Sequence, residues 1–222
     1  LSTVKTVNGK KPVFFGLDAK NDFYAKNIKN SGDGKVLATL CFDNNNIDVE
    51  IPAIGTYMVT NALAAAAAGK LLGLTDEEIA NGVASYKTVG SRANVINTGK
   101  IKIIDDCYNA NPTSVRASLD TLSNLDGRKV AILGDMKELG SEELKLHFDT
   151  GVYAKSKGIG TVITVGELAK ELAKGADGKA FDTIEDAKPE ILKTIKSGDV
   201  VLVKASHSMQ FENIVEFLKQ NF

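Results

Sequence analysis

The sequence is poor in the residues that hold metal ions or form disulfides, with two cysteines and two histidines in 222 residues. Cys41 and Cys107 stand far apart in the chain, and such a pair indicates neither a disulfide framework nor a zinc site. His147 and His207 are also too far apart to build a metal cluster. A reducing compartment, the cytoplasm, is the setting that this cysteine usage favours.

Long apolar runs and an excess of one charge are missing too. The net charge is −1, which gives no broad basic surface for the phosphates of a nucleic acid. The most apolar stretch begins at Ala62 but is interrupted at Gly69 and Lys70, well short of the roughly 20 residues that cross a bilayer. We therefore expect a protein that binds no nucleic acid and does not insert into a membrane, with enough apolar residues for a sizeable core.

The first part of the sequence reads as a small β-meander followed by a pair of helices. Strands are expected at residues 4–7, 12–17, 35–42 and 47–51, separated by Asn-Gly, Asp-Gly and Asn-rich turns. From Thr56 the apolar residues repeat at helical spacing. Thr75-Asp-Glu-Glu78 is a capping-box pattern that opens a second helix, which extends to about Tyr86.

A change of pattern at residues 88–93 marks a hinge, so we divide the chain into domains at residues 1–89 and 90–222. Beyond the hinge, apolar strands are expected at residues 100–105, 129–133, 160–165, 180–181 and 199–203. Helices are expected between and after them, at residues 113–125, 142–156, 167–174, 184–195 and 210–219. This alternation predicts βαβ units and an α/β, Rossmann-like domain with a mostly parallel sheet covered on both faces.

Polar chemistry is concentrated in residues 103–112, Ile-Ile-Asp-Asp-Cys-Tyr-Asn-Ala-Asn-Pro, where an apolar strand runs into a helix start. Pro112 suits the first turn of that helix, and the side chain of Asn111 can cap it. Open α/β sheets bind ligands at the carboxyl ends of their strands, so Tyr108 and Asn109 are candidates for a binding site. Asp105 and Asp106 are adjacent and point to opposite faces, so only one of them is expected to meet a ligand.

A second candidate region follows the last strong strand. Lys204 supplies a cation, and the backbone N–H groups around Ser206 add partial positive charge, which together favour an anion. His207, next to them, can be charged or neutral near pH 7. The loop of residues 134–140 also follows a strand, and although it fails as a dinucleotide fingerprint, Asp135 and Glu138 are possible site residues.

Four stretches resemble, in order and spacing, the Mur ligase family. They are Asn61-Ala-Leu-Ala-Ala, Asp105-Asp-Cys-Tyr-Asn-Ala-Asn-Pro-Thr-Ser, Leu133-Gly-Asp-Met-Lys-Glu-Leu-Gly140 and Leu202-Val-Lys-Ala-Ser206. Within the family, Tyr108-Asn-Ala-Asn111 is most similar to the branch that joins D-alanyl-D-alanine to UDP-N-acetylmuramoyl-tripeptide in peptidoglycan precursor synthesis. The resemblance implies an ATP-dependent, ADP-forming amide ligase that uses Mg²⁺ and works through an acyl phosphate.

The resemblance also implies a role for each candidate residue. Arg92 and Lys204 would be catalytic; Asn61, Arg92, Asp106, Tyr108 and Asn109 would bind the nucleotide; Asn111, Lys204 and Ser206 would bind substrate; no metal ligand is assigned. Without the resemblance, Asn61 is a helix-surface amide, Arg92 a solvated linker residue, and the two aspartates a turn-forming pair. Residues 1–89 would be the end of a central ATPase domain and residues 90–222 a C-terminal domain, in a monomeric protein.

No G-x-x-x-x-G-K-[ST] loop occurs in the sequence. Because that loop holds the β- and γ-phosphates, we expect this chain alone not to turn over ATP. Other readings remain open. The chain could come from another Mur-type ligase or a folylpolyglutamate-type synthetase, from a phospho-acceptor signalling module with Asp135 as the acceptor, or from a non-catalytic nucleotide-binding module.

Overall fold

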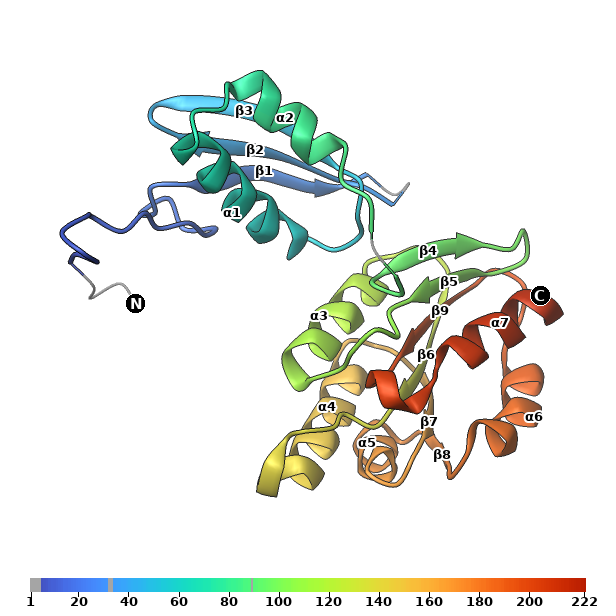
Figure 1. Ribbon diagram of the computed structural model, residues 1–222. Helices are drawn as coiled ribbons and strands as arrows, with labels where there is room; N and C mark the ends of the chain where they lie inside the picture. The colour runs from blue at the N-terminus through green and yellow to red at the C-terminus, as the bar shows by residue number, and fades with distance from the viewer. Residues whose placement is uncertain (1–4, 32–33, 89) are drawn as a thin grey trace. The chain divides into compact units, whose positions relative to one another are not determined.

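The computed structural model describes residues 5–31, 34–88 and 90–222, which form two compact units, Leu1–Lys87 and Thr88–Phe222 (Figure 1). Each unit has its own hydrophobic core. None of the helices in the described part of the chain has the length and apolar character needed to cross a membrane.

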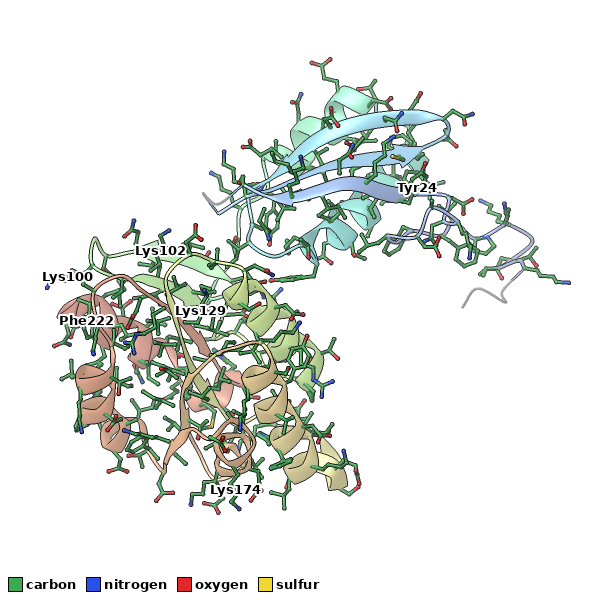
Figure 2. All side chains as sticks on the ribbon, turned by 180° about the vertical axis from the view of Figure 1, so that it is seen from behind. Tyr24, Lys100, Lys102, Lys129, Lys174 and Phe222 are labelled. Carbon is green, nitrogen blue, oxygen red and sulfur yellow. The ribbon has the colours of Figure 1, made fainter. Side chains whose placement is uncertain are left out.

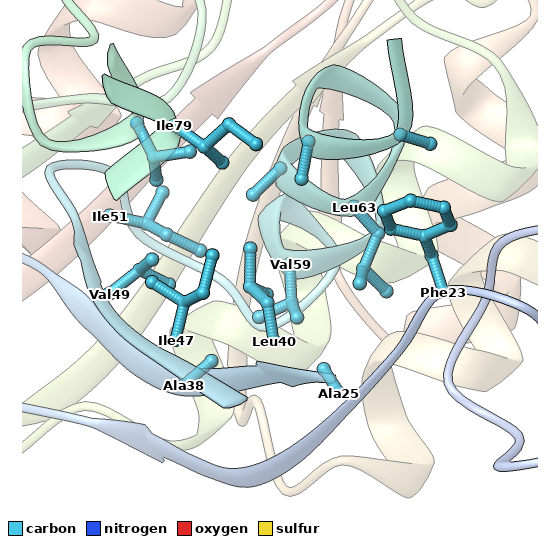
Figure 3. Close-up of a cluster of buried hydrophobic side chains, with 14 of the residues drawn as sticks. Phe23, Ala25, Ala38, Leu40, Ile47, Val49, Ile51, Val59, Leu63 and Ile79 are labelled. Atoms are coloured by element: carbon cyan, nitrogen blue, oxygen red, sulfur yellow. The ribbon is translucent and has the colours of Figure 1, made fainter. Parts of the chain in front are cut away.

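The first unit is a three-stranded antiparallel sheet with two helices on one face. Its strands are β1 (Tyr24–Asn30), β2 (Val36–Phe42) and β3 (Asn45–Ile51), in the order β1-β2-β3, and its helices are α1 (Met58–Leu71) and α2 (Asp76–Ala84). Alternate residues of β3, Ile47, Val49 and Ile51, turn toward the helices, where Val59 and Ile79 are among the residues that close the core (Figure 3). The strands expected at residues 35–42 and 47–51 and the helix pair are confirmed, including the capping box of Thr75 and Glu78.

Two of the expected strands are wrong. Val4 lies outside the described residues, and Val7 makes only an isolated bridge to Lys10. In residues 12–17 only Phe15 makes a bridge, to Phe23 just before β1, and these residues form no strand. The strand that the sequence did not suggest is β1, whose sequence Tyr-Ala-Lys-Asn-Ile-Lys-Asn is mostly polar because it lies at the sheet edge.

The second unit is a six-stranded sheet in the order β4-β5-β9-β6-β7-β8. Its strands are β4 (Asn94–Asn97), β5 (Lys102–Asp105), β6 (Arg128–Gly134), β7 (Thr161–Val165), β8 (Lys179–Phe181) and β9 (Asp199–Lys204). All neighbouring pairs are parallel except β4 with β5. The predicted mostly parallel α/β sheet is confirmed. The antiparallel edge strand β4 is an addition, because the sequence analysis placed no strand between the hinge at residues 88–93 and residue 100.

Helices cover both faces of this sheet (Figure 1). The α-helices are α3 (Pro112–Ser123), α4 (Glu143–Ser156), α5 (Ala169–Ala176), α6 (Ile184–Thr194) and α7 (Glu212–Asn221), with short 3₁₀ turns at Gly140–Glu142 and His207–Met209. Helices α3, α4 and α5 contact one another in sequence, and α6 contacts α7. Alternate strand residues such as Ile103 and Val201 join the core under α6 and α7, so their neighbours face the α3 to α5 layer.

The order of the strands decides where polar side chains can meet. Lys102 and Lys129, labelled in Figure 2, stand where β5 and β6 begin, so the opposite edge of the sheet carries the ends of these strands. The last strand, β9, lies between β5 and β6, and all three run in the same direction. The residues that follow β5, β9 and β6 therefore meet at one edge, called here the carboxyl rim. Such a change in strand order is where open α/β sheets form ligand crevices.

Candidate functional site

At the carboxyl rim the carboxylate of Asp106 is fully engaged by neighbouring groups. Its Oδ2 accepts hydrogen bonds from Nζ of Lys204 at 2.6 Å and from the hydroxyl of Ser118 on α3 at 2.7 Å. Its Oδ1 accepts from the backbone N–H of Ala93 at 3.1 Å. Asp106 is buried, and these partners satisfy the carboxylate within the second unit.

Lys204 is the counterion of Asp106. Its side chain is buried, and Nζ also donates to the backbone carbonyl of Asn109 at 2.9 Å. The ammonium group thus ties the end of β9 to the segment that follows β5. Two expected site residues, Asp106 and Lys204, are brought into direct contact, but they face each other rather than an open crevice.

Tyr108 and Arg92 form an exposed pair at the same rim. The guanidinium carbon of Arg92 lies 3.8 Å from the centre of the Tyr108 ring, which is the geometry of a cation–π contact. The backbone N–H of Tyr108 donates to the carbonyl of Ser91 at 2.9 Å, so the hinge and the segment after β5 are joined through their backbones. The ring of His207, after β9, lies 6.0 Å from that of Tyr108. The structure therefore brings Arg92, Tyr108 and His207 together at the surface, with about half of Tyr108 exposed.

Ser206 and the loop after β6 make a second polar group, next to the Asp106–Lys204 pair. The backbone N–H of Lys137 donates to Oγ of Ser206 at 2.9 Å, and the backbone N–H of Ser206 donates to the carbonyl of Asp135 at 3.0 Å. The ammonium group of Lys137 pairs with Asp135 at 2.7 Å and is partly exposed. Lys137 was not singled out by the sequence analysis, although its place in the loop after a strand could have suggested it.

Asp135 is buried, and both of its carboxylate oxygens are occupied. Oδ1 accepts from the backbone N–H of Ala169, at the start of α5, at 2.8 Å, and Oδ2 accepts from Lys137. This role in holding a helix start speaks against the phospho-acceptor reading, which needs an accessible carboxylate. Glu138, in the same loop, is exposed and has a left-handed backbone with φ of 64°.

Asn111 caps helix α3, as the sequence predicts. Its side-chain oxygen accepts from the backbone N–H of Ser114 at 2.8 Å, its own N–H donates to the Ser114 hydroxyl, and Pro112 is the first helical residue. The side chain of Asn109 is exposed, and its oxygen accepts from the N–H of Ala110. The amide of Asn111 is therefore partly committed to the helix, while Asn109 stays near the surface of the rim.

Asp105 points away from Asp106, to the face covered by α7, and lies beside Cys107. Burial, followed by the negative charge of Asp105, raises the pKa of the Cys107 thiol far above its ordinary value. Asp105 Oδ1 is buried without a hydrogen-bond partner among the described residues. Cys107 itself donates to the Val203 carbonyl and is a free thiol.

Asn61 belongs to the first unit, whereas all the other expected site residues belong to the second. It is exposed near the start of α1, and its amide nitrogen lies 3.4 Å from the sulfur of Met58. Together with Met58 it lines a mostly apolar pocket of about 310 Å³ between α1 and α2. No group of three or more His, Cys, Asp or Glu side chains placed to share a metal ion occurs among the residues that the structure describes.

His147, which the sequence analysis considered only as a possible metal ligand, is a further functional candidate. The structure shows it completely buried on α4, where Nε2 accepts a hydrogen bond from the backbone N–H of Met136 at 2.9 Å. Its Nδ1 lies 2.7 Å from the carbonyl of Glu143. This contact could not be predicted from the sequence, because helical periodicity does not show which side of the helix meets the loop after β6.

A mostly parallel sheet with polar side chains gathered where its last strand, β9, lies between β5 and β6 is typical of α/β domains that bind a ligand at this edge. The sequence matches the Mur ligase glutamate ligase domain over residues 91–207 and the Mur ligase middle domain over residues 2–69. The chain belongs to the Mur ligase family.

Relatives with names and solved structures agree with this assignment. The UDP-N-acetylmuramoyl-tripeptide--D-alanyl-D-alanine ligase of Bacillus subtilis (strain 168) is 34% identical over 92% of this chain and 46% of its own length. The crystal structure of MurF from Acinetobacter baumannii has a TM-score of 0.87 at 30% identity and covers 94% of this chain and 46% of that one. MurF from Thermotoga maritima, solved in complex with ADP, has a TM-score of 0.83 at 27% identity, covering 94% and 48%. The chain thus spans about half the length of the relatives it matches.

Proposed function

We propose that this chain is part of an ATP-dependent amide ligase that adds D-alanyl-D-alanine to UDP-N-acetylmuramoyl-tripeptide during peptidoglycan precursor synthesis. Support comes from the names of the relatives, which state this pair of substrates. The observation that carries the proposal is a set of unused hydrogen-bond donors at the carboxyl rim, where Ser206 and Lys137 lie side by side.

These donors suit the carboxylate of the incoming dipeptide. Oγ of Ser206 accepts from the backbone N–H of Lys137, and no acceptor for its own hydrogen is present among the described residues. The ammonium of Lys137 has three donors, of which Asp135 takes one, and its side chain is 44% exposed. The two residues are in contact through the backbone N–H of Lys137, and an ammonium or a hydroxyl can donate a charge-assisted hydrogen bond to a carboxylate.

We propose that the nucleotide lies toward Tyr108 and Arg92. The half-exposed ring of Tyr108 offers a surface for a base, and the guanidinium of Arg92 offers forked donors to a phosphate once it leaves the ring. Asn109 is exposed next to Tyr108 in the chain. Asn61, which belongs to the first unit, stays a predicted nucleotide contact. ATP supplies the phosphoryl group that activates the substrate carboxylate. Mg²⁺ would accompany its phosphates, and we assign it no ligand in this chain.

Lys204 and Asp106 support the site in this proposal by fixing its framework. The ion pair holds the segment after β5 against the end of β9, so that Tyr108 and Ser206 are carried by connected backbones. A direct contact of Lys204 with a substrate carboxylate would require the ammonium to release Asp106 or the carbonyl of Asn109. Asn111 caps the start of α3 at the rim, and we propose that the exposed part of its side chain contacts the substrate.

The test is a titration of the chain with D-alanyl-D-alanine, followed by calorimetry or by amide NMR shifts. We expect binding that Lys137→Met and Ser206→Ala each weaken by about tenfold, because each loses one charge-assisted hydrogen bond. Lys100→Met, an exposed lysine at the opposite edge of the sheet, is the matched control and should bind as the parent does. Equal affinity for D-alanine alone, or equal binding by all three variants, would refute the assignment.

We also propose that the protein works as a monomer in the cytoplasm. Both cysteines are buried free thiols, which is consistent with a reducing compartment. Sedimentation of the purified chain checks the first part, since a particle of twice 23.6 kDa would contradict it.

A further inference from the structure

We infer that His147 is a positioning residue, which holds the loop of residues 135–137 so that Ser206 and Lys137 can bind the incoming dipeptide. The inference rests on the proposed function for its ligand, but its structural part stands on contacts within the second unit. His147 is completely buried, and it would act on the rim through its hydrogen bond with the backbone N–H of Met136.

The hydrogen bonds of His147 define a single neutral form of the ring. Because Nε2 accepts from the N–H of Met136, it carries no hydrogen. Nδ1 then carries the hydrogen and donates it to the Glu143 carbonyl, 2.7 Å away on the first turn of α4. The imidazole is thus held at both nitrogens, with one end fixed to the helix and the other to the loop.

The loop depends on this contact because, among the described residues, the imidazole of His147 is the acceptor for the N–H of Met136 and no second acceptor takes part. Met136 is completely buried, so water cannot replace the imidazole as the acceptor for its N–H. A loop that lost the contact would move to hydrate this N–H group. Helix α4, which carries His147, is itself held in place by close packing on α5. Gly151, one turn beyond His147, lets the backbones of the two helices come into contact.

The effect reaches the rim through the next peptide group. The N–H of Lys137 directly follows the Met136 residue and donates to Oγ of Ser206, so a rotation at Met136 moves that donor away. The Ser206 hydroxyl would then lose the hydrogen bond that fixes the position of its oxygen. The ammonium group of Lys137 would shift as well, because its side chain is carried by the same backbone that moves.

Three variants separate positioning from simple packing. His147→Gln places an amide oxygen near the position of Nε2 and keeps an acceptor for Met136. His147→Leu fills the space but offers no acceptor. Thr150→Val is the matched control, because Thr150 is completely buried on the same helix and bonds only to the Leu146 carbonyl.

The measurements are amide hydrogen exchange at Met136 and Lys137, the ¹⁵N signals of the His147 ring, and the affinity for D-alanyl-D-alanine. We expect the parent ring to be the Nδ1–H form, and we expect His147→Leu to raise exchange at both amides and to weaken dipeptide binding, each by about tenfold or more. His147→Gln should stay within about threefold of the parent, and Thr150→Val should match it. If His147→Leu does not fold, the ring form of the parent and the rescue by glutamine still decide the matter.

Three results would overturn the inference: an Nε2–H ring in the parent, unchanged dipeptide affinity in His147→Leu, or a loss of affinity in Thr150→Val as large as in His147→Leu. Failure of the proposed function looks different. In that case no variant binds the dipeptide, while the exchange pattern at Met136 still follows the acceptor at position 147.

Discussion

The buried pair of Asp106 and Lys204 shows how single residues at the rim depend on one another. A charged side chain that leaves water loses its hydration, and in this structure each partner replaces part of that loss for the other. The Ser118 hydroxyl and the Ala93 N–H supply the rest for Asp106. Removal of one partner therefore leaves an uncompensated buried charge, which is worse than removal of both charges.

We predict that Lys204→Met lowers the free energy of unfolding of the second unit by roughly 3–5 kcal/mol. Adding Asp106→Asn should recover part of this loss, because the amide keeps an acceptor for Ala93 and carries no charge. Urea unfolding of the two variants and of Asp106→Asn alone forms a double-mutant cycle. Lys219→Met is the control, since its ion pair with Glu216 is exposed and should be almost neutral. A double variant no more stable than Lys204→Met would contradict the argument.

Cys107 gives a prediction for alkaline pH. Burial and the neighbouring Asp105 raise the pKa of its thiol above the ordinary value of 9.0, so the folded protein keeps a proton that the unfolded chain releases. The stabilisation is complete below the unfolded pKa and is lost as the pH rises above it, with a slope of about 1.4 kcal/mol per pH unit. Thermal or urea unfolding between pH 8 and 10 checks this, because Cys107→Ala should show a shallower decline than the parent. Parallel declines in the two proteins would rule the effect out.

At the scale of elements, the contact of α4 and α5 is set by two glycines. A Cβ atom at Gly151 would lie 2.0 Å from the Leu172 carbonyl oxygen, and one at Gly175 would lie 2.3 Å from that of Phe148. Since both obstacles are backbone atoms, the helices would have to separate. We predict that Gly151→Ala destabilises the second unit by about 3 kcal/mol or more, measured by thermal unfolding.

The control for this prediction is Gly82→Ala in α2. A Cβ at that position meets nothing within 4 Å, so the better helix propensity of alanine should stabilise the first unit by about 0.5–1 kcal/mol. If both substitutions had the same small effect, close packing of α4 on α5 would not be the reason for glycine at residue 151.

The helices and strands that could be predicted from the sequence are those whose apolar residues recur in a clear pattern. The helices of the second unit and its buried strands lie close to their expected residues, because one side of each helix and both faces of each strand are apolar. The edge strands β1 and β4 were missed because they bury few side chains. Residues 12–17 look like a strand, but Phe15 and Leu17 remain largely exposed and the segment makes a single bridge, from Phe15 to Phe23.

The sequence allowed only one feature of the candidate site to be predicted, namely that its residues follow the ends of strands. That rule collects Asp106, Lys204 and Ser206 at one edge of the sheet. It cannot show that Lys204 faces Asp106. That contact exists because β9 lies next to β5 in the sheet, and the order of strands in a sheet differs from their order in the chain. Lys137 and His147 were missed for a related reason: their roles depend on how the loop after β6 packs on α4.

At the scale of the whole molecule, the two units divide the features expected of a ligase between them. The first carries Asn61, and the second carries Arg92, Tyr108 and the carboxyl rim. The sequence has no G-x-x-x-x-G-K-[ST] loop to hold the β- and γ-phosphates of ATP. Under the proposed function, dipeptide binding and phosphoryl transfer would therefore separate in this chain, because Ser206 and Lys137 are proposed to bind the dipeptide and the phosphate-binding loop is missing from the sequence.

We predict that this chain, supplied with ATP, Mg²⁺, UDP-N-acetylmuramoyl-tripeptide and D-alanyl-D-alanine, binds the dipeptide but releases no phosphate above background. Phosphoryl transfer depends almost entirely on positioned donors around the phosphates, so their absence should remove turnover, whereas the Ser206 and Lys137 donors need no nucleotide to bind a carboxylate. A phosphate-release assay run beside a full-length ligase as positive control, with dipeptide titration of the same sample, measures both. Turnover near that of the full-length enzyme would show that the phosphates are held by other groups in this chain. If a folded sample did not bind the dipeptide, the proposal that the carboxyl rim binds it would be wrong.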